Sequence, residues 1–313
     1  MITYGQNYID YQKTINRVDN DICANQLESA LLRLDSVHEL YSFIYAKHCY
    51  KALQISCKLK DSSEIDKWLT KSFVQGIPFW IVQEDSLLKT VFAFDNCKET
   101  LLEYDSLRKI YLGKVNVPLR ITVDSLIEID QRLTHQVNDG FILLRYTFHL
   151  YRWLKNNKRQ LEIIKQLTAN FGFPGEQLIG LPIQCENSIK FQPNMSLGML
   201  LQETNTYIML IHCFSNPRPD FNELLFVEVK KGNLPANQFG AINDFMAAYG
   251  KNKYGKYSYY NVWHTDPFEE NIRSINDNRN KIGLMPFEEQ ERNQRLFYEC
   301  RKNRTLFKEI ALE

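Results

Sequence analysis

The sequence predicts a mainly α-helical protein. Apolar side chains recur at steps of three and four residues over most of the 313 positions, which is the period of one helix face. These patterns stop at glycines such as Gly76, Gly172 and Gly232, as helices commonly do. Only the tyrosine-rich segment 251–267 favours extended structure, and there we expect a short β-hairpin.

The composition is that of an ordinary globular protein. Hydrophobic residues make up 44% and charged residues 24%. A net charge of +1 provides no global field that would favour nucleic acid or an anionic membrane. The seven cysteines are scattered and form no CxxC pair, so neither a disulfide framework nor a zinc site is indicated.

The sequence also indicates a compartment. No window approaches the roughly 20 apolar residues of a membrane-spanning helix, and the first 20 residues lack the apolar run of a signal peptide. We therefore expect a cytoplasmic protein, although a chain trimmed of a secretory leader would look the same. No cofactor is predicted, because no motif with a known mechanism occurs.

The length predicts two domains, because single cores stop growing at about 250 to 300 residues. The periodicity breaks between Gly113 and Pro118, which gives a helical domain 1–112 and a larger helical domain 113–313 with the hairpin. Residues up to about Asn20 lack clear periodicity, and we expect them to be irregular.

The first domain resembles one unit of a tetratricopeptide-like helical hairpin. A helical pattern runs from Leu27 to Leu59, and after a turn at 60–63 a second helix ends at Gly76. Such arrays usually need about three units, so we expect the helices around Asp85–Phe94 and Lys98–Tyr111 to stack on this one.

The second domain begins with the most informative helix, from Asn116 to Val137. Its apolar stripe carries a carboxylate, Asp130, at the step between Leu126 and Leu133. A buried carboxylate needs a cation, hydrogen-bond donors, a raised pKa or a wet cleft. The common explanation is a structural ion pair; the sharper one is a functional site.

Two residues could neutralise the Asp130 carboxylate or form a hydrogen bond with it. His212 lies in an apolar helix that runs from Ser196 to Asn216, where it is either a core histidine or an acid–base partner of Asp130. A His212–Cys213 dyad is excluded, because adjacent helical positions diverge by about 100°. Arg279 is the other candidate partner, at a cleft where the three residues meet.

Two further segments bear on metal binding and on nucleic-acid binding. His264 and Asp266 have the spacing of half a metal site, but no third ligand accompanies them, so no metal is predicted. Tyrosines and lysines interleaved between Tyr249 and Trp263 suit base stacking and phosphate contact, yet the same tyrosines suit a hairpin packed on helices. The overall charge argues against nucleic acid.

Several residues together resemble a bacterial domain family of unknown function, from about Leu119 to Gly283. They are Asp130-Gln131, Gly172-Phe173-Pro174, Gly180, His212, Tyr254-Gly255, Arg279 and Gly283-Leu284. The family pattern has Gly-Trp-Pro, Gln-His and Tyr-Gly-Thr-Gln at these places, so Phe173, Ile211 and Lys256-Tyr257 depart from it. The resemblance marks Gln131, Tyr254 and Arg279 as candidates for ligand binding and implies no reaction.

Two functions are expected from these features. The first is a non-enzymatic interaction module, in which the repeat-like domain binds a peptide or protein partner in an apolar groove near Tyr41 to Phe79. The alternative is a hydrolase-type enzyme that uses Asp130 and His212 as acid–base groups and Arg279 to orient an anionic substrate. Whether the protein is an enzyme is left open by the sequence.

Overall fold

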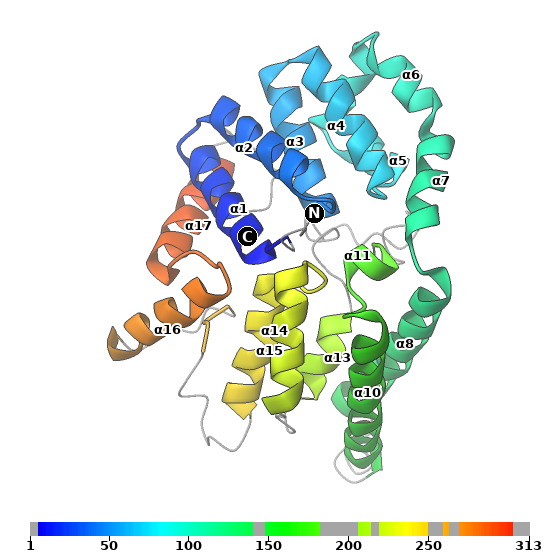
Figure 1. Ribbon diagram of the computed structural model, residues 1–313, viewed down its shortest axis with the longest axis vertical. Helices are drawn as coiled ribbons and strands as arrows, with labels where there is room; N and C mark the ends of the chain where they lie inside the picture. Colours follow the sequence, from blue (N-terminus) through cyan, green and yellow to red (C-terminus); the bar gives the residue numbers. More distant parts are fainter. Residues whose placement is uncertain are drawn as a thin grey trace, which may run out of the picture. The chain divides into compact units, whose positions relative to one another are not determined.

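The computed structural model describes residues 6–139, 148–181, 206–213, 219–249, 259–262 and 269–302. Every regular element in these ranges is a helix, so the predicted mainly α fold is confirmed (Figure 1). Within the same ranges, no helix combines the length and the apolar character needed to cross a membrane. The predicted hairpin at 251–267 lies outside the described residues except for 259–262, which form bends and a turn.

The chain folds into two compact units, which are described separately. The amino-terminal unit comprises Asp10–Val115, Gly180–Glu203 and Glu288–Glu313. The central unit comprises Met1–Ile9, Asn116–Ile179 and Thr204–Phe287. The domain limits expected from the sequence stay a prediction.

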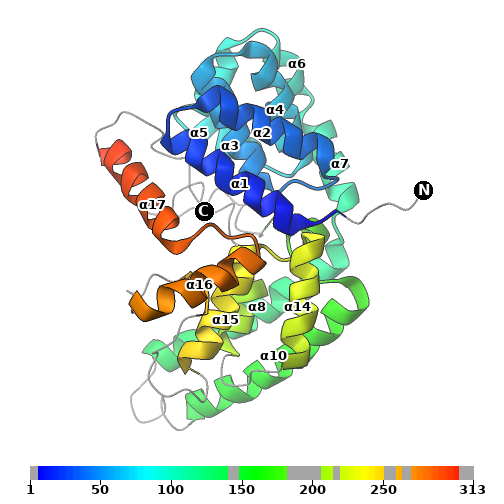
Figure 2. The ribbon, with the colours of Figure 1, turned by 60° about the vertical axis from the view of Figure 1, so that its left-hand side comes forward.

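The amino-terminal unit is built around α3. Its elements are α1 (Tyr8–Cys23, from Asp10 on), α2 (Leu27–Leu40), α3 (Ala46–Leu59), α4 (Ser62–Val74), α5 (Phe79–Glu84), the 3-10 helix η1 (Leu88–Ala93), α6 (Cys97–Leu102), α7 (Tyr104–Lys114) and α17 (Phe287–Lys302, from Glu288 on). Every residue of α3 from Ala46 to Cys57 is buried. Figure 2 shows α1, α2 and α3 as neighbours. Helix α3 therefore forms the centre of this unit.

The chain up to Asn20 was expected to be irregular, but residues 8–20 form most of α1, so that expectation was wrong for them. Apolar residues at steps of three and four do exist there, and Tyr11, Ile15 and Val18 are buried. Polar residues are buried on the same helix, and Asp19 is paired with Lys51 of α3 at 2.5 Å. Buried polar side chains weaken the contrast between the two faces, which is the signal that periodicity measures.

The helix predicted from Leu27 to Leu59 is in fact two, α2 and α3, separated by Tyr41–Tyr45. Tyr41 and Tyr45 have extended backbone angles, and their rings pack on Tyr11 with centroids at 5.1 and 5.8 Å. Aromatic side chains lose rotamer freedom in a helix, so ring packing outweighs a weak helical preference here. The apolar periodicity continues across the break and conceals it.

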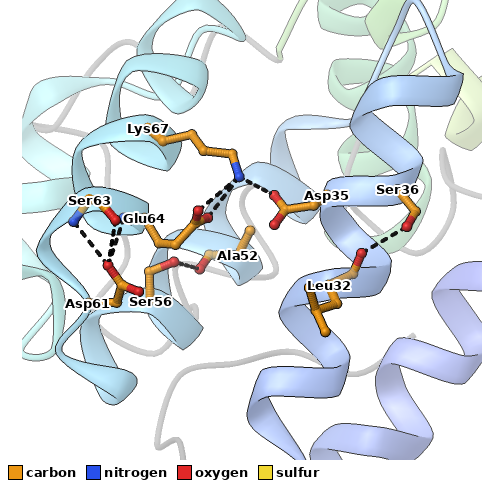
Figure 3. Close-up of polar contacts among 9 residues, drawn as sticks. All are labelled: Leu32, Asp35, Ser36, Ala52, Ser56, Asp61, Ser63, Glu64 and Lys67. Atoms are coloured by element: carbon orange, nitrogen blue, oxygen red, sulfur yellow. Dashed lines mark hydrogen bonds and ion pairs between the residues drawn. The ribbon is translucent and has the colours of Figure 1, made fainter.

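A lysine ties α4 to α2 in this unit. Figure 3 shows Lys67 between Glu64 of its own helix and Asp35 of α2, with Nζ 2.9 Å and 2.6 Å from carboxylate oxygens. Partial burial lowers the pKa of Lys67, but hydrogen bonds to both carboxylates outweigh this and raise the pKa overall. Lys67 is 35% exposed, so we expect solvent to screen the pair and keep its contribution small.

The central unit is a helical bundle. Its elements are α8 (Val117–Asp139), α10 (Leu150–Phe171), α11 (Glu176–Ile179), α13 (Thr206–His212), α14 (Pro219–Lys231), α15 (Ala236–Tyr249) and α16 (Glu269–Lys281). Its apolar core contains Val123 of α8, Ile164 of α10 and Leu210 of α13, with residues from α14 and α15. Helices α8 and α10 lie side by side (Figure 1).

Two predicted helix ends in this unit are confirmed. Asn116 caps α8 by accepting a hydrogen bond from the backbone N–H of Leu119 at 3.1 Å. Helix α10 stops at Gly172, whose φ of +91° suits glycine. The turn that follows is held by buried Glu228 of α14, which accepts the N–H of Phe173 at 2.8 Å.

Candidate site at Asp130 and His212

Asp130 is a fully buried carboxylate in the middle of α8, with 0% exposure. It lies in the apolar stripe predicted from the sequence, in which Val123 and Leu133 are also buried. An unpaired carboxylate in such a place would destabilise the fold by several kcal/mol, in order of magnitude. Its partners therefore decide what this position can do.

His212, the last residue of α13, is the main partner of Asp130. Its Nδ1 lies 2.7 Å from Oδ2 of Asp130. An ionised carboxylate only accepts hydrogen bonds, so Nδ1 carries the proton that is donated and, in the neutral ring, Nε2 keeps a free lone pair. The His212 side chain is 20% exposed, so a buried acid orients an imidazole that solvent can reach.

Helix α10 holds the backbone and ring of His212 in place. Asn157 donates from Nδ2 to the carbonyl of His212 at 2.9 Å, which satisfies a carbonyl at the end of α13. The ring of Trp153 meets the imidazole edge-on, with centroids 5.7 Å apart. The Trp153 indole in turn donates to Oγ1 of Thr134 on α8 at 3.1 Å.

These contacts form a polar seam, which we define as Leu126, Asp130 and Thr134 of α8 with Trp153, Asn157 and Gln160 of α10. At its far end Gln160 donates to the Leu126 carbonyl at 2.7 Å. Three buried acceptors in the seam have no hydrogen-bond partner: Oδ1 of Asp130, Oδ1 of Asn157 and Oε1 of Gln160. Each such atom costs about 1–3 kcal/mol.

Cys213 follows His212 but is not an activated thiol. Burial, together with the nearby charge of Asp130, raises the pKa of the Cys213 thiol to about 12. Its Sγ points to the backbone carbonyl of Asn157, at 3.1 Å. A protonated buried thiol is a poor nucleophile. This agrees with the exclusion of a His212–Cys213 dyad from the helical geometry.

A small pocket lies next to Cys213, between α10, α13, α14 and α15. Its volume is about 20 Å³, enough for about one water molecule. Apart from Asn222 its lining is apolar or sulfur-bearing, with Leu161, Phe221 and Ile242 among the residues. It is too small to hold an organic substrate as it stands.

Arg279 is held elsewhere in the central unit. The polar contacts of Asp130 are with His212 and with Nε2 of Gln131 at 3.2 Å, so Arg279 is not among its partners. Arg279 is 1% exposed and donates to the backbone carbonyls of Met285 at 2.6 Å and Tyr260 at 2.7 Å. These bonds fasten Met285 after α16 and Tyr260 before it. A role for Arg279 in orienting a substrate stays a prediction.

The other candidates from the sequence are placed as follows. Gln131 is exposed on α8 beside Asp130. Tyr254, His264 and Asp266 lie outside the described residues. In the part of the chain that is described, no three histidine, cysteine, aspartate or glutamate side chains are grouped as a metal ion would require.

Protein-family models, curated proteins and solved structures were compared with the chain. None matches. The resemblance to a bacterial domain family of unknown function therefore stays a prediction, and so does the tetratricopeptide-like character of the first helices. The case for a function rests on the geometry of the polar seam.

Sequence reasoning missed the α10 half of the seam. Trp153, Asn157 and Gln160 follow the three and four spacing of one helix face, which was the available signal. Asn157 and Gln160 stand in a helix with many charged residues, where polar side chains are typical of a solvated surface. Only the pairing of α10 with α8 identifies that face as an interior one.

Proposed function

We propose that the central unit is a hydrolase-type domain in which His212 is the acid–base group. The observation that supports this most is the hydrogen bond of 2.7 Å between a carboxylate with 0% exposure and an imidazole with 20% exposure. A buried acid that fixes the tautomer of a reachable histidine is the arrangement that general acid–base catalysis needs.

The proposed chemistry uses water as the nucleophile. Nε2 of His212 takes a proton from a water molecule as the water oxygen attacks an acyl carbon, and Asp130 stabilises the imidazolium that results. The imidazolium then returns the proton to the leaving oxygen or nitrogen as its bond to carbon breaks. No thiol is required, which is consistent with the raised pKa of Cys213.

A panel of p-nitrophenyl esters and aminoacyl p-nitroanilides tests this proposal. We expect slow hydrolysis of at least one compound by the wild type and a loss of about 100- to 10,000-fold in His212→Gln and Asp130→Asn. His135→Gln is the matched control, because His135 is an exposed histidine of α8. No hydrolysis by the wild type, or equal rates in all three variants, would refute the proposal.

A second proposal is that the amino-terminal unit binds a peptide or protein. All residues from Tyr41 to Phe79 are described, and no large hydrophobic side chain among them is exposed, so the expected apolar groove is not found there. The observation in favour of binding is on α2, where Leu32 and Leu40 are 66% and 68% exposed. They stand on one side of the helix, with Ser36 between them.

Affinity capture with immobilised protein tests the second proposal. A Leu32→Lys/Leu40→Lys variant replaces the two leucines at sites that bear little packing, so it should fold like the wild type. We expect a protein retained by the wild type, identified by mass spectrometry, to be lost from this variant and kept by Leu102→Lys, which replaces an exposed leucine of α6. Identical retention by all three proteins would show that Leu32 and Leu40 of α2 do not form the binding surface.

A further inference from the structure

The polar seam contains more hydrogen-bond acceptors than donors. Asp130, Asn157 and Gln160 are 0%, 3% and 1% exposed, and each has one buried oxygen without a partner. Buried polar atoms in native proteins nearly always have a partner, so three in one seam need an explanation. All three are acceptors, so the group that would satisfy them is one rich in hydrogen-bond donors.

The register of the two helices places these oxygens on facing surfaces. Gln160 reaches the Leu126 carbonyl at one end of the seam, and Trp153 reaches Thr134 at the other. Helices α8 and α10 therefore run antiparallel here, which sets Asn157 opposite Asp130. The bond from Asn157 to the His212 carbonyl supports this register, because His212 also holds Asp130.

The amide groups cannot remove the mismatch by turning over. The NH2 groups of Asn157 and Gln160 each donate to a backbone carbonyl, at 2.9 and 2.7 Å. Turning either amide over would place its oxygen against that carbonyl oxygen and lose the bond. The unpartnered oxygens are therefore fixed as acceptors by the backbone.

We propose that the polar seam binds a primary ammonium group. An alkylammonium carries three N–H donors, which match the three acceptors, and one positive charge, which matches the single carboxylate. A divalent metal ion fits less well, because calcium takes six to eight oxygen ligands and magnesium keeps several waters. His212 is 20% exposed, and we expect the group to enter from its side of the seam.

This inference rests on the proposed function, since it names the class of substrate for the same site. The substrate carries a primary amine, and Asp130 uses one oxygen to orient His212 and the other to bind the ammonium. Binding is separable from turnover. Ammonium binding without hydrolysis would uphold the inference and refute the proposed function. Hydrolysis with no preference for substrates that carry an amine would uphold the proposed function and refute the inference.

Titration with methylammonium chloride, followed by thermal unfolding, tests the inference. Tetramethylammonium chloride at the same concentration is the comparison, because it has the charge but no N–H donor. We expect methylammonium alone to raise the melting temperature of the wild type, in a saturable way. Equal shifts with the two salts, or no shift with either, would overturn the inference.

Variants of the seam locate the binding. Gln160→Met keeps the side-chain length and removes one acceptor, and we expect it to weaken methylammonium binding at least tenfold. Gln177→Met is the matched control, because Gln177 of α11 also has a buried oxygen without a partner but lies outside the seam. If Gln160→Met does not fold, Asp130→Asn, which keeps the shape of the side chain and removes its negative charge, should instead abolish the saturable shift. Unchanged affinity in the folded seam variant would place the ammonium elsewhere and overturn the proposal.

Discussion

Asp130 depends on His212 more than on any other residue. Its carboxylate is fully buried, and its second contact, with the exposed side chain of Gln131, is longer at 3.2 Å. In an apolar stripe, a charge without its partner is much more costly than the pair itself. The stability of the central unit should therefore respond strongly to the loss of either member.

Removal of His212 is predicted to destabilise the protein. His212→Ala leaves the Asp130 carboxylate buried without its main donor, and we expect the free energy of unfolding to fall by about 3–5 kcal/mol. Urea denaturation followed by far-UV circular dichroism measures this loss. Asp130→Leu/His212→Leu should be more stable than His212→Ala, because it leaves no buried charge.

The control for this prediction is on the same helix. His135→Ala removes an exposed histidine of α8 and should change the free energy of unfolding by no more than about 0.5 kcal/mol. If His212→Ala cost no more than His135→Ala, the pair would contribute nothing to stability and its burial would need another explanation.

Asp130 and His212 were recognisable in the sequence because each interrupts an apolar stripe. Their partners were not, because Asn157 and Gln160 are ordinary residues for a helix surface. Arg279 was recognised as notable, but for a different role from the one its contacts indicate, which is fastening backbone carbonyls of Met285 and Tyr260. The sequence can therefore indicate that a polar residue is buried, but its hydrogen-bond partners are known only from the tertiary contacts.

At the scale of elements, helix ends were predicted better than helix continuity. Asn116 and Gly172 act through their own backbone neighbours, so their roles follow from local sequence. The break at Tyr41–Tyr45 depends on packing against Tyr11, about 30 residues away, and periodicity cannot detect it. The helical pattern of α1 was missed because some of its polar residues are buried against α3, where Asp19 pairs with Lys51, and local sequence does not reveal such a partner.

Two glycines in helical surroundings are predicted to respond in opposite directions to alanine. At Gly172 a Cβ would lie 2.9 Å from Asn233 and 3.0 Å from Glu228, at a positive φ, so Gly172→Ala should cost about 1–3 kcal/mol. At Gly113, in α7, an added Cβ would meet no heavy atom within 4 Å apart from the neighbouring backbone of its own helix, and Gly113→Ala should stabilise by up to about 1 kcal/mol. Chemical denaturation of both variants tests this; a shift of the same sign in both would contradict the assigned backbone conformations.

At the scale of the whole molecule, buried polar groups occur in both units. In the amino-terminal unit, fully buried Asp85 accepts hydrogen bonds from Tyr50, from Gln54 and from the backbone at the start of η1. Asn20 of α1 bonds to Glu289 and Asn293 of α17, some 270 residues later in the chain. The mainly α class was predictable from periodicity, but such pairs were not, because a polar residue carries no sign of a distant partner.

Alkaline pH is predicted to destabilise the protein. Burial raises the pKa of Cys57 and of Cys213 from 9.0 to about 12, and that of Tyr260 from 10.0 to about 12. Between these values the unfolded chain loses protons that the folded chain keeps. The contribution of these groups to the free energy of unfolding is therefore fully present below pH 9 and is lost as pH rises towards 12. Each group contributes a slope of about 1.4 kcal/mol per pH unit at most.

Denaturation of the wild type and Cys213→Ala from pH 8 to 11 measures this effect. The variant lacks one of the three groups, so we expect its stability to decline less steeply than that of the wild type. Parallel curves for the two proteins would mean that the Cys213 thiol ionises as readily in the folded state as in the unfolded one.

The most direct test of the Asp130–His212 pair is nitrogen-15 NMR of the histidine rings, under conditions where the rings are neutral. The buried carboxylate requires His212 to carry its proton on Nδ1 and to leave Nε2 unprotonated, and this tautomer should be lost in Asp130→Leu. The comparison of the wild type with Asp130→Leu isolates the effect of the carboxylate on the ring. A proton on Nε2 of His212, or the same tautomer in Asp130→Leu as in the wild type, would contradict the proposal that Asp130 prepares His212 for acid–base chemistry.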